Sequence, residues 1–154
     1  MEFTVDDLTQ VVAHMAQLAS TEDGWINLIP KINDNGERPT SLAFFTLFGG
    51  GGGGVTMCTW VPGSHSRRRV IRPRLGIAHG TGHRVFAELR SLAVPIPKSW
   101  FVEQGHPRRG LVLQVPSDES HEQALGWALR AVNALTAPRP ISRWRADIYM
   151  PTTS

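Results

Sequence analysis

Two clusters of arginine are the residues in this sequence best suited to bind a ligand. The first is Arg67-Arg68-Arg69, followed by Arg72 and Arg74, and the second is Arg108-Arg109, close to His106. A guanidinium binds a carboxylate or a phosphate through two parallel hydrogen bonds, so either cluster would suit an anionic partner. The candidate partner-binding residues are Arg67, Arg68, Arg69, His106, Arg108 and Arg109.

A glycine pair offers a second kind of anion site. Gly80, Thr81 and Gly82 precede a predicted helix, where free backbone amides and the helix dipole would face a bound phosphate. Ordinary turn chemistry explains the same glycines, so both interpretations stay open. The longer run of glycines at 49–54 does not predict a P-loop, because Val55-Thr56-Met57 follows it in place of lysine and a hydroxyl residue.

The histidines do not predict a metal centre. His79 and His83 are four residues apart, but His79 precedes the expected start of the helix and no third ligand lies nearby. The lone cysteine, Cys58, excludes an internal disulfide and a cysteine-based zinc site, and its apolar strand predicts a buried side chain. We therefore expect neither a metal nor a cofactor.

Acid–base chemistry is a weaker alternative. Glu103 and His106 could meet across a hairpin as an acid–base pair. The neighbours Ser64-His65-Ser66 do not align as a nucleophile and a base, and no orienting acid is near them in the sequence. A small enzyme would need a histidine, such as His79, His83 or His106, to converge with a carboxylate such as Glu88 or Glu103.

Composition predicts one folded domain. The chain has 154 residues, 41% of them hydrophobic and 19% charged, which is too apolar for a disordered chain. Of its 16 basic residues only two, Lys31 and Lys98, are lysines, so the remaining 14 are arginines. The basic balance fits nucleic acid, although no base-reading motif accompanies it. The acidic start Met-Glu-Phe-Thr-Val-Asp-Asp is not that of a signal peptide, and we expect a cytoplasmic protein.

Apolar spacings of three and four residues predict three helices. The first begins at a cap on Thr4 and continues to Thr21, and the second covers 85–92 and ends before Pro95 and Pro97. The third and most regular is capped by Ser117 and buries one face. That face comprises Ala124, Leu125, Ala128, Leu129, Val132 and Leu135.

Apolar and alternating runs predict strands at 25–29, 42–48, 55–61, 70–78, 99–104, 110–115 and 144–150. Pro30 places the first strand at an edge or ends it, and Pro73 interrupts the fourth. Residues 40–64 carry no charge and could span a bilayer, but six glycines would each cost about 1 kcal/mol in a helix. We expect a hairpin over 41–61 in a soluble protein, with both faces of its strands covered.

The order of these elements resembles the type III secretion chaperone-like families, which include the YbjN-related proteins, over residues 5–135. The resemblance implies a non-catalytic domain that binds a partner polypeptide, often as a homodimer. The chain differs in being basic and in carrying a strand after its long helix.

The sequence thus predicts a single α+β domain at 1–154, an antiparallel-rich sheet with three helices. Its leading function is a protein- or peptide-binding module. The alternatives are an arginine-rich nucleic-acid-binding protein and a small histidine/carboxylate enzyme. A nucleic acid and a second copy of the chain stay open as partners, and a membrane is not expected.

Overall fold

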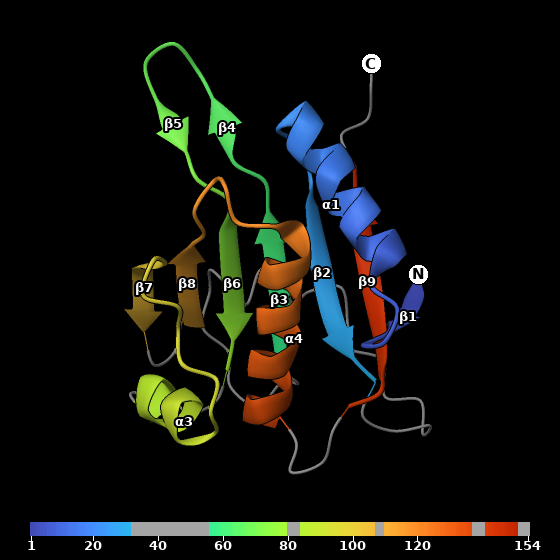
Figure 1. The fold of residues 1–154 in the computed structure, drawn as a ribbon, viewed down its shortest axis with the longest axis vertical. Coiled ribbons are helices and arrows are strands. Elements are labelled where there is room, and N and C mark those ends of the chain that lie inside the picture. Colours follow the sequence, from blue (N-terminus) through green and yellow to red (C-terminus); the bar gives the residue numbers. More distant parts are fainter. Residues whose placement is uncertain (32–55, 80–83, 107–109, 137–140, 151–154) are drawn as a thin grey trace.

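The computed structural model describes residues 1–31, 56–79, 84–106, 110–136 and 141–150. They form an α+β body in which α1, α3 and α4 pack on one face of an antiparallel sheet (Figure 1). The described part of the sheet has seven strands in the order β1-β9-β2-β3-β6-β8-β7, and a two-stranded ribbon, β4-β5, is separate from it. The predicted fold class is therefore confirmed.

The bounds of the elements follow the chain. The strands are β1 (Glu2–Thr4), β2 (Trp25–Pro30), β3 (Met57–Val61), β4 (Ser64–His65), β5 (Val70–Ile71), β6 (Arg74–Ala78), β7 (Phe101–His106), β8 (Gly110–Gln114) and β9 (Arg143–Tyr149). The helices are α1 (Thr9–Thr21), α3 (Val85–Ser91) and α4 (His121–Thr136).

Alternation along each strand gives the sheet one apolar face. Leu28 of β2 pairs in register with Cys58 of β3 and Ala146 of β9, and all three side chains are buried in the core beneath the helices. The next residues along the strands point away from the helices. There the Thr59 hydroxyl donates to Asn27 Oδ1 at 2.7 Å, and both side chains are buried, which confirms the expectation that both faces of β3 are covered.

Two predicted helix starts were wrong. Thr4 lies in β1, where Phe3 is buried against Trp144 and Thr4 pairs with Arg143. The first amides of α1 are served instead by Asp7, whose Oδ1 accepts from Thr9 N at 3.2 Å. Burying Phe3 in the sheet outweighs what a threonine cap contributes.

The cap of α4 lies three residues beyond its predicted place. Residues Pro116 and Glu119 close a turn, with Glu119 N donating to Pro116 O at 3.1 Å. Ser120, not Ser117, accepts from the backbone N of Gln123 at 3.1 Å. The turn therefore occupies the stretch in which the sequence predicted the first turn of the helix.

The predicted hairpin over 41–61 was also wrong in its pairing. β3 is hydrogen-bonded to β2 on one side and to β6 on the other, so neither of its edges is open to a strand at 42–48. Residues 42–48 and the glycine run lie outside the described residues. No helix in the described ranges is long and apolar enough to cross a membrane.

Other strands agree with the sequence. β2 ends at Pro30, as predicted, but it is an inner strand that lies between β9 and β3. The sheet tolerates the proline there because Pro30 is the last residue of the strand, and the ladder with β9 is complete. Pro73 separates β5 from β6, and β7 pairs with β8 as a hairpin. Trp144 and Ala146 of β9 are buried, whereas Met150 lies beyond the strand and is exposed.

Candidate functional site

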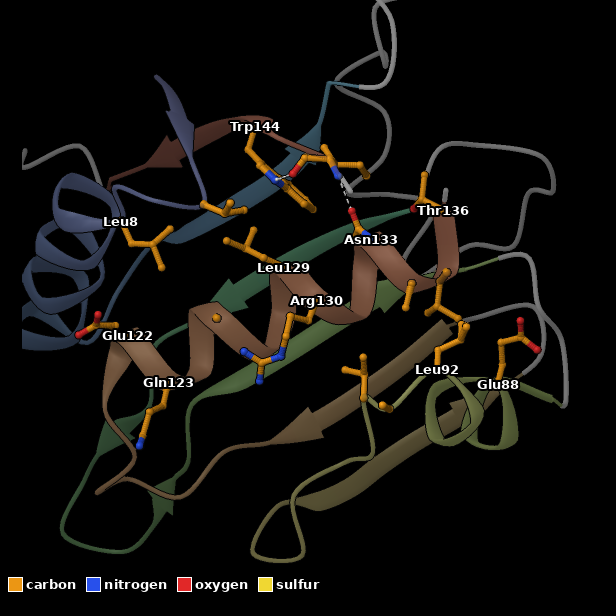
Figure 2. Close-up of a pocket in the computed structure, with 17 residues that line it drawn as sticks. Leu8, Glu88, Leu92, Glu122, Gln123, Leu129, Arg130, Asn133, Thr136 and Trp144 are labelled. Atoms are coloured by element: carbon orange, nitrogen blue, oxygen red, sulfur yellow. Dashed lines mark hydrogen bonds between the residues drawn. The ribbon is translucent and has the colours of Figure 1, made fainter. Parts of the chain in front are cut away.

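A groove of about 1200 Å³ follows the outer side of α4 (Figure 2). One wall comes from the segment before α1 and from the start of β9, and the other from the end of α3 and the turn after it. The groove is thus bounded by segments far apart in the sequence, which the packing of the three helices on the sheet brings together.

The sequence of α4 explains why this side of the helix is open. Leu125, Ala128 and Val132 are buried, as predicted, while Glu122 and Arg130 on other faces are exposed. Gly126 adds no side chain between these two, and a Cβ there would meet only Arg130 Nη1, at 3.5 Å. At the middle of the groove the backbone of α4 is therefore not covered by a side chain, which leaves room for a ligand to approach it.

Hydrogen bonds tie the segment at the start of β9, which belongs to the first wall, to the end of α4. Asn133 Oδ1 accepts from Ile141 N at 2.6 Å, and Ile141 O accepts from Trp144 Nε1 at 3.2 Å (Figure 2). Trp144 is completely buried, and Leu8 and Val5 continue this wall toward α1. Val5 is 45% exposed, so this wall ends in an uncovered apolar side chain.

The opposite wall is the C-terminal end of α3. Leu92 N donates to Glu88 O at 3.0 Å, and Ala93 turns the chain with a φ of 60°, which a small residue tolerates better than a branched one. Trp127 Nε1 donates to Pro95 O at 3.0 Å and ties this turn to α4. Leu92 is 45% exposed and matches Val5 across the groove.

Three charged side chains line the groove, namely Glu88, Glu122 and Arg130. None of them forms an ion pair with another of the described residues. Two carboxylates and one guanidinium give the groove a formal charge of minus one, in a chain whose net charge is +3. The groove therefore combines apolar walls with charges available to a ligand.

The first arginine cluster does not lie in this groove. Arg67, Arg68 and Arg69 lie in the turn between β4 and β5, and all three are exposed. His106 ends β7 and is also exposed, while Arg108 and Arg109 fall outside the described ranges. The predicted glycine site at Gly80, Thr81 and Gly82 lies outside them as well, so its role stays a prediction.

The expected acid–base pair does not span a hairpin turn, because Glu103 and His106 lie on one strand, β7. Glu103 Oε1 is 3.7 Å from Arg74 Nη1, and its Oε2 accepts from Gln114 Nε2 at 3.3 Å. The Glu103 carboxylate is therefore engaged by two neighbouring strands.

His79, the residue after β6, is half-buried, and burial lowers its pKa. Neither ring nitrogen of His79 has a hydrogen-bond partner among the described residues. Within those same residues no three histidine, cysteine or acidic side chains are grouped so as to hold a metal ion. His83, the other half of the predicted pair, is not described.

His65 has an acid that the sequence did not reveal. Its Nδ1 lies 2.7 Å from Glu22 Oε1, and its backbone N donates to Glu22 Oε2 at 2.9 Å. These two contacts lower the pKa of Glu22, the backbone hydrogen bond most. The adjacent Ser66 hydroxyl donates to Arg69 O at 3.2 Å and so belongs to the turn.

Cys58 is buried as predicted, and burial raises the pKa of its thiol.

Comparison of the chain with protein-family models, curated proteins and solved structures finds no match. The site is therefore defined by its own geometry. The groove could not be predicted from the sequence, because its two walls come from residues that are remote along the chain, such as Val5 on one wall and Leu92 on the other. The signal that could have pointed to it is Gly126, a residue that costs helix stability in the middle of a regular helix.

Proposed function

We propose that this domain is a non-catalytic module that binds a peptide segment of another protein in the groove along α4. One observation carries the proposal. Apolar side chains on both walls remain exposed beside three charges that have no partner in the described chain. Exposed apolar surface combined with a few charged groups is typical of a protein-binding site.

The groove suits a helical or extended segment with apolar side chains on one side. α4 has 16 residues and is therefore about 24 Å long, which matches a peptide of similar length lying beside it. In helix-in-groove recognition, side chains at positions i, i+3, i+4 and i+7 enter the apolar groove. Gly126 leaves room for such a side chain near the middle of α4.

Charge selects the partner further. Because Glu88 and Glu122 outnumber Arg130, a segment with a lysine or arginine beside its apolar residues is favoured over an acidic one. Each such pair lies at the surface and contributes only about 0.2–1 kcal/mol. The apolar contacts therefore supply most of the affinity, and the charges set orientation and specificity.

Selection from a display library of random peptides about 16 residues long tests this proposal. Gly126→Leu fills the groove with a good helix former, and Ala16→Leu adds the same side chain at an exposed position of α1 outside it. We expect enriched peptides with apolar spacings of three and four and a basic residue, with Kd values of about 1–100 µM. Gly126→Leu should weaken them about tenfold or more, and Ala16→Leu should leave them unchanged.

Nuclear magnetic resonance then locates the bound peptide. Shift changes confined to α4, α3 and the segment before α1 would support the groove. Enriched peptides that bind Gly126→Leu as well as the wild type, or that shift residues of another surface, would refute it.

A further inference from the structure

The ribbon formed by β4 and β5 projects beyond the end of the main sheet as a narrow arm (Figure 1). It continues the hairpin of β3 and β6, and its tip is the turn Ser66–Arg69. In this turn Ser66 N donates to Arg69 O at 2.9 Å, and Arg69 N donates to Ser66 Oγ at 3.1 Å. The turn therefore holds Arg67 and Arg68 at the outermost point of the arm.

Two contacts fix the arm to the body. In the first, the carboxylate of Glu22, at the end of α1, accepts from the backbone N of His65 and contacts the ring of the same residue. The second is the close approach of Gly63, which precedes β4, to the segment that leads from β5 to β6. A Cβ on Gly63 would lie 2.5 Å from Ile71 O and 3.0 Å from Pro73 Cδ. The arm is thus presented in a set direction, which reduces the ordering that binding would require.

Four arginines cluster on this arm without acidic partners. Arg67, Arg68, Arg69 and Arg72 are exposed, and none forms an ion pair within the described parts of the chain. Both oxygens of Glu22, the acid that contacts the arm, are engaged by His65. The next arginine, Arg74, already faces Glu103. The positive charge is therefore concentrated in the tip turn of the arm and at the residue that follows β5.

We propose that this arm docks on double-stranded nucleic acid and contacts its phosphates without reading the base sequence. A guanidinium matches a phosphate bidentately, and a two-stranded ribbon is narrow enough to lie along a groove of a duplex. Single strands are held by aromatic side chains that stack on bases, and the arm carries only one aromatic ring, His65, which is bonded to Glu22.

An anionic membrane fits the arm less well. Surface-bound membrane segments bury several large apolar side chains, whereas Val70 alone is strongly exposed on the arm, at 62%. None of the arm's residues lines the groove along α4, so this proposal is independent of the peptide-binding function.

Fluorescence anisotropy with a labelled duplex of about 20 base pairs, measured between about 50 and 200 mM salt, tests the proposal. The test variant changes Arg67, Arg68 and Arg69 to Ala. A matched control changes Arg84, Arg90 and Arg143 to Ala, which removes the same charge from exposed positions outside both the arm and the groove. A third variant replaces the three arm arginines with lysine and keeps the charge. Circular dichroism checks that each variant is folded.

We expect the wild type to bind scrambled duplexes equally and to lose affinity steeply with salt. Each phosphate contact contributes about 0.9 to the slope of log K against log salt, so the alanine variant should lower the slope by about 3. Its affinity at the lowest salt should fall about tenfold or more, whereas the lysine variant and the matched control should change it only slightly.

Four results would overturn the proposal. They are an equal loss in the matched control, no loss in the arm variant, tighter binding of a single strand than of the duplex, and arm-dependent binding to vesicles with about 30% phosphatidylserine that exceeds binding to the duplex.

Discussion

The groove along α4 and the arginine arm are built in opposite ways. The groove's walls include completely buried Trp144 and nearly buried Leu129, so its outline is part of the core. Residues 65–70 of the arm are all exposed, and hydrogen bonds and one carboxylate hold them in place. A concave apolar site is therefore inseparable from folding, whereas a charged arm can change its side chains at little cost to stability.

The largest expected difference between the two regions is in stability. Trp144→Ala removes an indole stacked on Phe3 and bonded to Ile141 O, and should lower the free energy of unfolding by about 3–5 kcal/mol. Arg68→Ala at the arm tip should change it by less than about 0.5 kcal/mol. Urea denaturation followed by circular dichroism measures both. A comparable loss from the two substitutions would contradict the comparison.

Gly63→Ala tests whether close backbone packing at the base of the arm fixes the direction in which the arm projects. The added Cβ would meet Ile71 O at 2.5 Å, and backbone atoms there cannot move aside as the end of a flexible side chain can. We expect a loss of about 1–3 kcal/mol in the free energy of unfolding, together with shift changes at the residues of β4 and β5. Unchanged stability and spectra would show that the connections have room to separate.

Gly126→Ala is the same chemical change in the groove, but it should change the free energy of unfolding in the opposite direction. Its Cβ would make only an ordinary contact with Arg130 Nη1, at 3.5 Å, and alanine favours the helix. The free energy of unfolding should rise by about 0.5–1 kcal/mol in the same denaturation experiment. A stabilised variant with weaker peptide binding would indicate that Gly126 serves the ligand rather than the fold.

The smallest expected effect is on the pH dependence of folding. His121 at the start of α4 packs edge-on against Trp60, and burial lowers its pKa, so the folded state favours the neutral ring. Its contribution to stability is present above the unfolded pKa of about 6.5 and is lost as the pH falls below it. His121→Gln should therefore lose less stability than the wild type between about pH 7 and pH 5.

His79 supplies a further check, because burial lowers its pKa as well. The double substitution of His79 and His121 by Gln should flatten the profile more than His121→Gln alone. A variant profile as steep as that of the wild type would show that other groups govern this range.

The sequence predicts the elements of this fold better than their pairing. Apolar periodicity located α3, α4 and most strands, because the local spacing of apolar residues such as Leu125 and Val132 indicates which face of an element is buried. It failed at Thr4, where pairing with the distant β9 overrides a local capping signal, and at β3, whose partners β2 and β6 are set by the whole sheet.

The candidate sites divide along the same line. The arginines of the arm are contiguous in the sequence, so their cluster could be predicted. The contact between Glu22 and His65 could not, because 43 residues separate them and only the packing of α1 beside the arm brings them together. The groove likewise depends on how three helices and a strand meet, which no local pattern in the sequence records.

The strand β7, one of the two edge strands of the described sheet, affects how the protein behaves at high concentration. Val102 pairs with Leu113 and Gln104 with the adjacent Val112, so Glu103 is an extra residue that interrupts the ladder. Phe101 is 59% exposed just before this bulge. Such an irregular, charged edge is a poor template for adding further strands. We therefore expect concentrated solutions to resist fibrillar self-association along this edge, despite its exposed phenylalanine.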